Sequence, residues 1–437
     1  MFKLRDYQEE CVNNIINMNE ESRKIACLPT GSGKTILMSE ICKRINKRVL
    51  IIVQSSELRQ QTIDKLKMVC GESVDVGSVQ GNIREYNNRI IVGTRQTITS
   101  NSFDMSKLIE KGNFEYILID ECHCAVKQAE TIINAIGKNS KVVGMTATPY
   151  NSDLKAVYHG FIYKRELIQM IEDKYLVDAI CYTVRSHVNI DNVRTYQGDF
   201  AINELSKTIN IESRNELIYK SYIEKCKDRN KTLIFATDIN HSKAIAEYFN
   251  KKGISCCSID GTLKKSERTQ ILKDFEDGKI KVLVNVMILT IGLDIPAIDS
   301  IIFARATQSK ALFIQMLGRG LRLSPETNKS DCLVVDIVDF TTKHNLVNCS
   351  SIFDAEDGES LVIAKNKKII VKTKKEDMLK EDVEQGVSPI DAILNNIEYQ
   401  ETDLFNENNI DCDKNMKSKK KTKSKGIKGL FKRLFNR

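Results

Sequence analysis

Short apolar runs alternate with stretches of helical period over the first third of the chain. Five such runs predict strands, at residues 24–28, 49–53, 90–93, 116–120 and 142–146. Between them, residues 35–44 and 56–68 place apolar side chains at the three- and four-residue spacing of a helix. Alternating strands and helices are typical of a mostly parallel sheet that carries helices on both faces.

The same pattern weakens over residues 150–210 and then resumes. Five more apolar runs predict strands, at residues 233–236, 256–260, 282–286, 301–304 and 333–336. Helices are predicted between them, at residues 239–252, 263–275 and 310–317. We therefore expect two α/β units, at residues 1–150 and 211–345, joined by a connecting region at 151–210.

After about residue 350 the chain is polar and mixed in charge. Its pattern predicts one weak strand, at 368–371, and one short helix-like patch, at 388–397. We interpret residues 346–413 as a linker or loosely folded extension, because so few apolar residues cannot form a core of their own. Residues 414–437 form a basic tail.

The composition is that of an ordinary globular protein. Hydrophobic residues make up 41% of the 437 residues and charged residues 28%, which excludes a wholly disordered chain or a fibrous repeat. No apolar run reaches the ~18 residues of a membrane span, and the N-terminus carries charge instead of the apolar core of a secretory signal. An odd number of cysteines, 13, without framework spacing indicates reduced thiols. We therefore expect a cytoplasmic protein.

The positive charge is concentrated in the tail. The formal net charge is +8, and residues 414–437 contribute +11 from nine Lys and two Arg, which leaves −3 for residues 1–413. Residues 417–425 form a polycation that could bind nucleic-acid phosphates, although a nuclear address or a disordered solubilising tail has the same composition. Residues 427–437 place apolar side chains at helical spacing between cations, which suits a membrane surface, a partner protein or nucleic acid.

A glycine-rich segment, Leu28-Pro-Thr-Gly-Ser-Gly-Lys-Thr35, follows the first strand and opens a helix. Gly31 and Gly33 allow backbone N–H groups to curl around phosphate oxygens without a clash from a Cβ atom. Lys34 offers a cation to the β- and γ-phosphates, Thr35 offers a hydroxyl to Mg²⁺, and the positive end of the helix dipole faces the anion. The general motif has Gly where this chain has Leu28. The segment predicts a nucleoside-triphosphate site.

The apolar run at 116–120 ends in Asp120 and is followed by Glu121. A carboxylate at the tip of a strand beside a phosphate loop can hold Mg²⁺. The next carboxylate is placed to orient or deprotonate the water that attacks the γ-phosphate. A solvated turn would explain an isolated Asp-Glu pair, but the phosphate loop favours the catalytic interpretation.

With these two segments the sequence resembles the superfamily 2 helicases over residues 1–345. Residues 29–35 resemble motif I, Asp-Glu-Cys-His at 120–123 resembles motif II in its DExH form, and Thr-Ala-Thr-Pro at 146–149 resembles motif III. Arg-Asp-Tyr-Gln at 5–8 resembles the glutamine motif that contacts adenine. In the second unit, the resemblance covers motifs IV, V and VI, at residues 232–236, 282–296 and 315–322. It implies two tandem RecA-like domains of the P-loop NTPase class.

Within the superfamily, the sequence is similar to the DEAD/DEAH-type DNA helicases, a branch that includes the phage UvsW helicase, the type III restriction ATPases and a mitochondrial branch-migration helicase. The similarity lies in Gln-Met-Leu-Gly-Arg-Gly-Leu-Arg at 315–322, Leu-Thr-Ile-Gly-Leu-Asp-Ile-Pro at 289–296 and Thr-Gln-Ser-Lys at 307–310. Two positions depart from the branch pattern. Ile291 stands where motif V usually has Glu, and residues 52–61 lack the usual Pro or His-Arg.

The resemblance also implies roles for individual residues. ATP is expected between the two units, with adenine contacted by Arg5 and Gln8. The nucleotide-binding residues of the phosphate loop are Pro29, Thr30, Gly31, Ser32, Gly33, Lys34 and Thr35. Mg²⁺ is expected on Thr35 and Asp120. The implied catalytic residues are Lys34, Asp120, Glu121, Gln315, Arg319 and Arg322, with Gln315 at the γ-phosphate or the attacking water.

The second unit is expected to supply two arginines to the γ-phosphate across the cleft. Arg319 and Arg322 are three residues apart, so the spacing predicts one helix face for both. By the same resemblance, Gly292 and Asp294 couple the nucleotide to the nucleic-acid strand, and closure is transmitted by His123, Thr146 and Thr148. The expected contacts to the nucleic-acid backbone are Thr94, Arg95, Gln96 and Thr290, although residues 94–96 could equally be an ordinary polar turn.

The predicted function is ATP-driven unwinding or remodelling of nucleic acid, with ATP and Mg²⁺ as cofactors and forked or branched DNA as substrate. Two alternatives stay open: an RNA helicase with the same ATP chemistry, and a nucleotide-gated nucleic-acid clamp or scaffold that barely hydrolyses. The clamp is disfavoured because the chain retains Lys34, Asp120, Glu121, Arg319 and Arg322. Since backbone contacts do not read sequence, we expect little sequence specificity.

Overall fold

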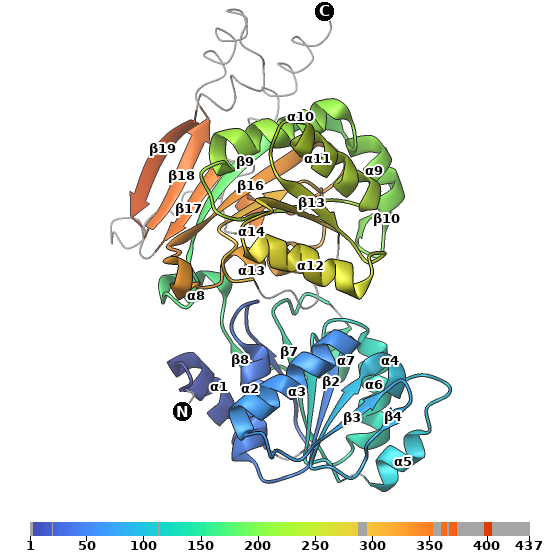
Figure 1. The fold of residues 1–437 in the computed structure, drawn as a ribbon. Coiled ribbons are helices and arrows are strands. Elements are labelled where there is room, and N and C mark those ends of the chain that lie inside the picture. The colour runs from blue at the N-terminus through green and yellow to red at the C-terminus, as the bar shows by residue number, and fades with distance from the viewer. Residues whose placement is uncertain are drawn as a thin grey trace, which may run out of the picture.

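Two α/β units, one above the other in Figure 1, make up the computed structural model. The structure describes residues 3–19, 21–111, 113–151, 153–286, 295–352, 360–364, 367–373 and 397–403. Each unit is built on one main sheet with helices on both of its faces. Among the helices within these ranges, none is long and apolar enough to cross a membrane.

The first unit contains an eight-stranded sheet in the order β4-β3-β5-β2-β6-β7-β1-β8. All neighbouring strands are parallel except β3 and β4. The strands are β1 (Arg23–Cys27), β2 (Val49–Val53), β3 (Val76–Gln80), β4 (Ile83–Arg84), β5 (Ile90–Thr94), β6 (Tyr116–Asp120), β7 (Lys141–Thr146) and β8 (Phe161–Lys164). The central strands are covered on both faces, which explains their continuous apolar runs.

Helices form a layer on each face of this sheet. They are α1 (Asp6–Ile16), α2 (Lys34–Arg44), α3 (Ser56–Cys70), α4 (Arg95–Ile98), α5 (Met105–Glu110), α6 (Val126–Ile136), α7 (Leu154–Val157) and α8 (Leu167–Glu172). Buried side chains of α1, α2 and α3 pack on one face, and those of α4 to α7 pack on the other. Both layers bury apolar stripes, which is why these segments have a helical period.

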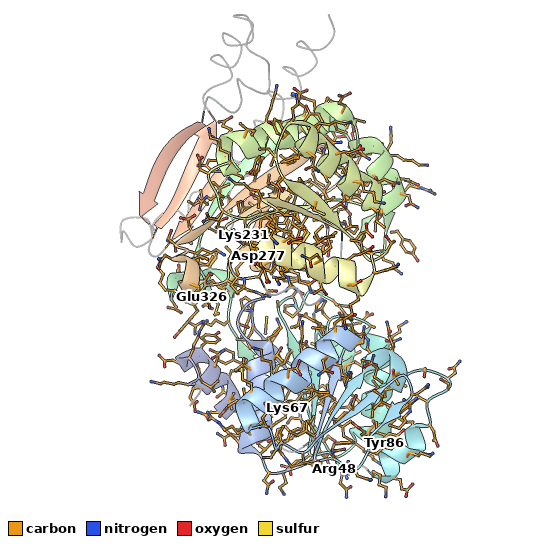
Figure 2. All side chains as sticks on the ribbon, in the orientation of Figure 1. Arg48, Lys67, Tyr86, Lys231, Asp277 and Glu326 are labelled. Carbon is orange, nitrogen blue, oxygen red and sulfur yellow. The ribbon has the colours of Figure 1, made fainter. Side chains whose placement is uncertain are left out.

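The carboxyl ends of the first unit's parallel strands face the second unit. Arg48 directly precedes β2, and Figure 2 shows it at the end of the first unit that lies away from the second. The opposite edge therefore lies next to the second unit. At this edge the phosphate loop follows β1, and Asp120 is the last residue of β6. Ligands of parallel α/β sheets bind at this edge.

The second unit contains a nine-stranded sheet in the order β13-β14-β12-β15-β16-β9-β17-β18-β19. Its strands are β9 (Asp178–Asn189), β12 (Thr232–Phe235), β13 (Cys256–Ile259), β14 (Val282–Asn285), β15 (Ser300–Phe303), β16 (Asp331–Phe340), β17 (Ser360–Ala364), β18 (Lys367–Thr373) and β19 (Ile397–Asp403). The strands from β13 to β9 in this order are parallel, and the last three are antiparallel additions. A small separate hairpin pairs β10 (Thr195–Tyr196) with β11 (Asp199–Phe200).

Helices also cover both faces of the second sheet. They are α9 (Ile202–Ile209), α10 (Glu212–Ser221), the π-helical turn Tyr222–Cys226, α11 (Ile239–Lys251), α12 (Lys265–Glu276), α13 (Lys310–Gly320), the 3-10 turn Pro325–Thr327 and α14 (Cys349–Ile352). Side chains of α10 and α11 pack on one face. Those of α12 and α13 pack on the other, in a buried cluster that continues through Leu176 and Leu321 to Leu28 of the first unit.

Each strand and helix that the pattern predicts for the two units is present, with shifted ends. The largest difference is β16, predicted at 333–336 and observed over Asp331–Phe340. The pattern does not predict β3, β4, β8 or β9. The strand β9 lies in the region expected to connect the units, yet it pairs with β16 inside the second sheet.

Residues 346–413 also contribute more strands than their pattern predicts. The strand predicted at 368–371 is present as β18, and β17 and β19 lie on either side of it. The strand β17 joins this group to β9. Of the predicted patch 388–397, residues 388–396 lie outside the described residues, and Ile397 begins β19. The basic tail also lies outside the described residues.

Candidate active site

The phosphate loop connects β1 to α2 and forms a tight turn. Gly31 has φ +86° and Gly33 has φ +80°, in the left-handed region that favours glycine. A Cβ atom on Gly33 would lie 2.8 Å from Gln8 Nε2, so the loop also needs glycine there for space. The Ser32 N–H donates to the Pro29 carbonyl at 3.2 Å and tightens the turn.

Two hydroxyls of this loop are buried. Thr30 and Ser32 are 8% and 1% exposed, and neither side-chain oxygen has a hydrogen-bond partner among the described residues. Buried polar groups are normally satisfied. An oxyanion bound in the loop would supply the missing partners, so the site fits a nucleoside triphosphate.

Lys34 begins α2 and connects the loop to the acidic pair. Its Nζ atom lies 3.5 Å from the Leu28 carbonyl oxygen and 3.6 Å from Glu121 Oε1. Asp120 ends β6, and its Oδ1 accepts a hydrogen bond from the Glu121 N–H at 3.1 Å. Burial and then the charge of Glu121 raise the pKa of Asp120 to about 7, and the Lys34 ammonium opposes this rise.

The donor set at this edge suits Mg²⁺. Hard carboxylate and hydroxyl oxygens are its preferred protein ligands. Burial and then the Glu121 charge disfavour an ionised Asp120, and a bound divalent cation would stabilise the ionised carboxylate. Asp120 and Thr35, which follows Lys34 on α2, would hold the ion. When bound, Mg²⁺ neutralises charge on the phosphate oxygens.

The glutamine motif is hydrogen-bonded to the phosphate loop. The Gln8 side chain accepts from the Arg5 N–H at 3.0 Å and donates to the Ser32 carbonyl at 2.9 Å. The Tyr7 hydroxyl donates to the same carbonyl at 2.7 Å. These contacts place the start of α1 beside the loop, where the resemblance expects adenine. Tyr7 lies inside the Arg-Asp-Tyr-Gln segment, but its sequence position alone does not indicate this role.

The end of α13 brings the second unit against the phosphate loop. A Cβ atom on Gly318 would lie 2.5 Å from Thr30 Cβ, and one on Gly31 would lie 3.3 Å from Arg322 Cγ. Arg322 therefore lies close to the loop, as does Gly318, the residue before Arg319. The prediction that one helix face presents both arginines is wrong, because α13 ends at Gly320 and Arg322 follows in a bend. Gly318 and Gly320 allow the close approach but weaken the helix end.

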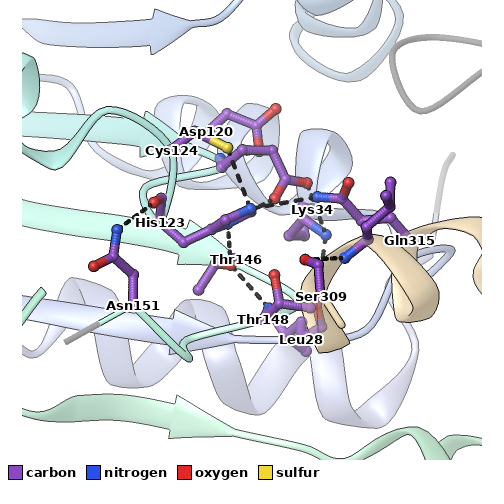
Figure 3. A network of polar contacts seen from close by, with 12 residues as sticks. Leu28, Lys34, Asp120, His123, Cys124, Thr146, Thr148, Asn151, Ser309 and Gln315 are labelled. Atoms are coloured by element: carbon purple, nitrogen blue, oxygen red, sulfur yellow. Dashed lines mark hydrogen bonds and ion pairs between the residues drawn. The ribbon is translucent and has the colours of Figure 1, made fainter. Parts of the chain in front are cut away.

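A chain of polar contacts crosses between the units at His123 (Figure 3). His123 Nδ1 lies 2.8 Å from Thr146 Oγ1 and 3.3 Å from Glu121 Oε2. Its Nε2 lies 3.5 Å from Gln315 Nε2 on α13. Thr146 Oγ1 also accepts from the Thr148 N–H at 2.9 Å.

The protonation of His123 follows from its surroundings. Burial lowers its pKa below the ordinary value, so the imidazole is neutral at neutral pH. A neutral imidazole has one donor and one acceptor nitrogen. With the proton on Nδ1, toward Glu121 and Thr146, Nε2 accepts from the Gln315 amide. Nε2 also lies 3.2 Å from Cys124 Sγ, so His123 contacts groups of both units.

Two family models match the chain, each over one of the two units. The model described as "Type III restriction enzyme, res subunit" matches residues 1–151, and that described as "Helicase conserved C-terminal domain" matches residues 212–324. The IRC3 proteins of two yeasts, both named for an ATP-dependent helicase, are 30% identical over 363 residues in Saccharomyces cerevisiae and 33% identical over 359 residues in Schizosaccharomyces pombe.

The chain belongs to helicase superfamily 2. Its alignments to the yeast proteins cover 77% of this chain but 51% and 57% of theirs, so it spans about half the length of these curated relatives. The DNA 3'-5' translocase XPB2 of Sulfurisphaera tokodaii is 24% identical, over 77% of this chain and 81% of that protein. The fold matches an HsdR-type subunit of a type I restriction enzyme from Vibrio vulnificus, at 18% identity and TM-score 0.59, over 79% of this chain and 70% of that chain.

The resemblance to superfamily 2 helicases also predicts residues that contact nucleic acid or couple it to the nucleotide. Thr290, Gly292 and Asp294 lie outside the described residues. The Thr94 hydroxyl is buried and donates to Thr97 Oγ1 at 2.8 Å.

The two residues after Thr94, Arg95 and Gln96, differ in exposure. The Arg95 guanidinium donates to the Cys124 carbonyl at 2.7 Å and so supports the motif II loop. Gln96 is exposed. Contact of residues 94–96 with nucleic acid stays a prediction, for which Gln96 offers the accessible side chain.

Proposed function

We propose that this superfamily 2 helicase hydrolyses ATP between its two units and uses the resulting closure to move along or unwind DNA of forked or branched structure. The observation that carries the proposal is the junction of α13 with the phosphate loop. Gly318 and Arg322 lie against Thr30 and Gly31, and Gln315 lies 3.5 Å from His123. Groups from residues 1–150 and 211–345, which we assign as the two motor domains, thus meet at one site.

The chemistry divides between the two sides of this junction. From the first unit, Lys34 binds the β- and γ-phosphates, and Arg5 and Gln8 contact adenine. Glu121 orients the attacking water and accepts its proton, which its position 3.6 Å from Lys34 permits. Thr35 and Asp120 are the residues for Mg²⁺.

The second unit responds to the γ-phosphate. Gln315 contacts this phosphate or the water, and Arg319 and Arg322 stabilise the charge that develops on it. An arginine finger is worth ~10³–10⁵ in rate.

Closure is coupled to nucleic acid through the His123 contacts. Thr146 ends β7 and its hydroxyl contacts His123, and the Thr148 N–H donates to the same hydroxyl, so a shift of Gln315 reaches the end of the first unit's sheet. Gly292, Asp294 and Thr290 carry the same signal to the strand in the second unit.

Three features support DNA over RNA. Motif II is Asp-Glu-Cys-His, and motif VI is Gln-Met-Leu-Gly-Arg-Gly-Leu-Arg, where RNA-unwinding DEAD-box proteins have Asp-Glu-Ala-Asp and His-Arg-x-Gly-Arg-x-Gly-Arg. The similarity to a protein named as a DNA translocase points the same way.

A reducing compartment fits the cysteines of the described residues, which are all free.

The experiment is steady-state ATP hydrolysis with single-stranded DNA, forked DNA and RNA supplied in turn, each with Mg²⁺. We expect forked DNA to stimulate turnover most and RNA least. Stimulation by RNA alone would make the protein an RNA helicase. Tight binding of DNA in ATP without turnover would make it a nucleotide-gated clamp.

A further inference from the structure

Three consecutive residues between α8 and β9 each contact a different part of the ATP site. They are Tyr175, Leu176 and Val177, and we call them the strap. The strap lies outside the residues matched by both family models, 1–151 and 212–324. No motif of the sequence predicts a role for it.

Tyr175 holds the residue expected at adenine. Arg5 Nη1 donates to the Tyr175 carbonyl at 3.2 Å, and Arg5 Cζ lies 5.5 Å from the centroid of the Tyr175 ring. The Tyr7 ring lies edge-on at 4.6 Å. Arg165, paired with Asp173, lies 5.5 Å from the same Tyr175 ring. Such cation–π contacts orient a guanidinium plane, so Tyr175 fixes the direction in which Arg5 presents its outer face.

Leu176 and Val177 touch the phosphate and arginine sides. Leu176 is fully buried. A Cβ atom on Gly31 would lie 3.2 Å from Leu176 Cδ2 and 3.3 Å from Arg322 Cγ. The Val177 N–H donates to the Leu321 carbonyl at 2.9 Å, one residue before Arg322. Leu176 and Arg322 therefore pack side by side on the loop, and Val177 holds the chain that carries Arg322.

The strap is held firmly enough to transmit a displacement. The N–H groups of Tyr175 and Leu176 both donate to the Met170 carbonyl, at 2.9 and 3.0 Å. Because the three residues are consecutive, a movement of Tyr175 must displace Leu176 or Val177 within a few ångströms. Packed interiors transmit such shifts instead of absorbing them.

We propose that the strap relays occupation of the base site to Arg322, so that adenine is recognised in turnover more than in affinity. Adenine stacked on Arg5 presses Tyr175 into its observed position, and Leu176 and Val177 then place Arg322 against Gly31. A base that does not engage Arg5 leaves Arg322 displaced. The strap residues are positioning residues, and the inference rests on the proposed hydrolysis of ATP.

The test compares ATP with GTP in Tyr175→Leu, which keeps an apolar side chain but removes the aromatic ring. We expect the unsubstituted protein, with DNA and Mg²⁺, to show a higher kcat on ATP than on GTP. In Tyr175→Leu, kcat on ATP should fall at least tenfold toward the GTP value, while kcat on GTP and KM for ATP change less than twofold. Tyr175→Phe keeps the ring and should restore the ATP rate.

Two further variants complete the design. Tyr196→Leu is the matched control, because Tyr196 is 70% exposed on β10, and it should hydrolyse both nucleotides as the unsubstituted protein does. Arg5→Lys keeps the charge but loses the planar group. If the relay runs through Arg5, Tyr175→Leu should add little to Arg5→Lys, because coupled sites are not additive. Should Tyr175→Leu not fold, Arg5→Lys alone must lower kcat on ATP selectively.

Each contrary result has a distinct meaning. Equal kcat on ATP and GTP in the unsubstituted protein, or a higher KM alone in Tyr175→Leu, would overturn the relay. An equal loss on both nucleotides that Tyr175→Phe does not restore would reduce Tyr175 to a structural residue. No hydrolysis of either nucleotide by the unsubstituted protein would instead overturn the proposed function.

Discussion

At the scale of single residues, the candidate site holds adjacent carboxylates against one ammonium group. Glu121 has φ +46°, a left-handed conformation that costs a non-glycine residue on the order of 1–3 kcal/mol. Its carboxylate lies between Lys34 Nζ, at 3.6 Å, and His123 Nδ1, at 3.3 Å. We interpret the strained turn as the means by which Glu121 reaches the phosphate loop directly after a strand.

Replacing Lys34 by Ala should abolish ATP hydrolysis and leave the fold intact. The substitution removes the cation for the β- and γ-phosphates and leaves Glu121 without its ammonium partner. Phosphate release measures ATP hydrolysis, and the thermal midpoint of unfolding measures whether the fold is retained. Lys43→Ala is the matched control, since Lys43 is exposed on the same helix and should be dispensable for hydrolysis. Normal hydrolysis by Lys34→Ala would remove the loop from the mechanism.

Replacing Arg322 by Ala should retain most of the ATP affinity while turnover falls by ~10³-fold or more, as for other arginine fingers. The first unit carries most of the expected nucleotide contacts, so binding should survive. Nucleotide titration and steady-state kcat separate the two quantities. Because Arg322 Cγ lies beside Gly31, Arg322→Gln is the sharper variant, as it keeps the aliphatic stem. Equal losses of affinity and turnover would show that Arg322 is a ground-state contact.

At the scale of elements, a buried ion pair joins a helix to the second sheet. Arg214 on α10 donates to both carboxylate oxygens of Asp339 in β16, at 2.7 and 2.8 Å, and to the Ala304 carbonyl at 2.9 Å. Both side chains are fully buried. Ala304 follows β15 and leads into the segment before α13. The pair therefore connects the helix layer with the strand that precedes the ATP-site helix.

Replacing Arg214 by Met should destabilise the second unit by about 3–5 kcal/mol, because it leaves the Asp339 carboxylate buried without its partner. Chemical unfolding followed by circular dichroism measures the loss. Arg194→Met is the control: Arg194 is 83% exposed and pairs with Glu204 at the surface, so its loss should be barely detectable. Similar unfolding midpoints for Arg214→Met and Arg194→Met would show that the buried pair does not stabilise the second unit as predicted.

At the scale of the whole molecule, charge is divided between body and tail. Residues 1–413 carry −3 and residues 414–437 carry +11. A body with a small negative charge gains little long-range attraction to DNA, and the tail can supply it.

Deleting the tail should therefore weaken DNA binding through its salt dependence. Each phosphate neutralised on duplex DNA contributes about −0.9 to the slope of log affinity against log salt. If about four tail cations engage, a chain ending at Asp413 should show a slope flatter by roughly 3 to 4 units. Turnover at saturating DNA should change little, since the expected ATP-site residues end at Arg322. An unchanged slope would direct the tail to a partner protein or membrane surface.

The chain's local pattern was sufficient for most of the parallel strands of both units and for the position of the phosphate loop and the acidic pair at their carboxyl ends. Strands such as β2 and β6 are apolar at every central position because both faces are covered, so burial is written into consecutive residues. The phosphate loop needs Gly, Lys and Thr at neighbouring positions, and the acidic pair follows a strand directly. Features that depend on contiguous residues can be predicted from sequence.

Features that depend on distant partners were decided by the tertiary structure. The strand β9 joins the second sheet because β16 offers it an edge 153 residues later, from Asp178 to Asp331, and no local signal specifies that partner. Arg322 leaves the helix because Gly318 and Gly320 pack against Thr30 and the second sheet. Tyr175, Leu176 and Val177 have ordinary side chains, and only folding brings them to Arg5, Gly31 and Leu321. Hydrogen-bond partners and close packing are chosen among surfaces that exist only once the chain has folded, so residue types alone do not encode them.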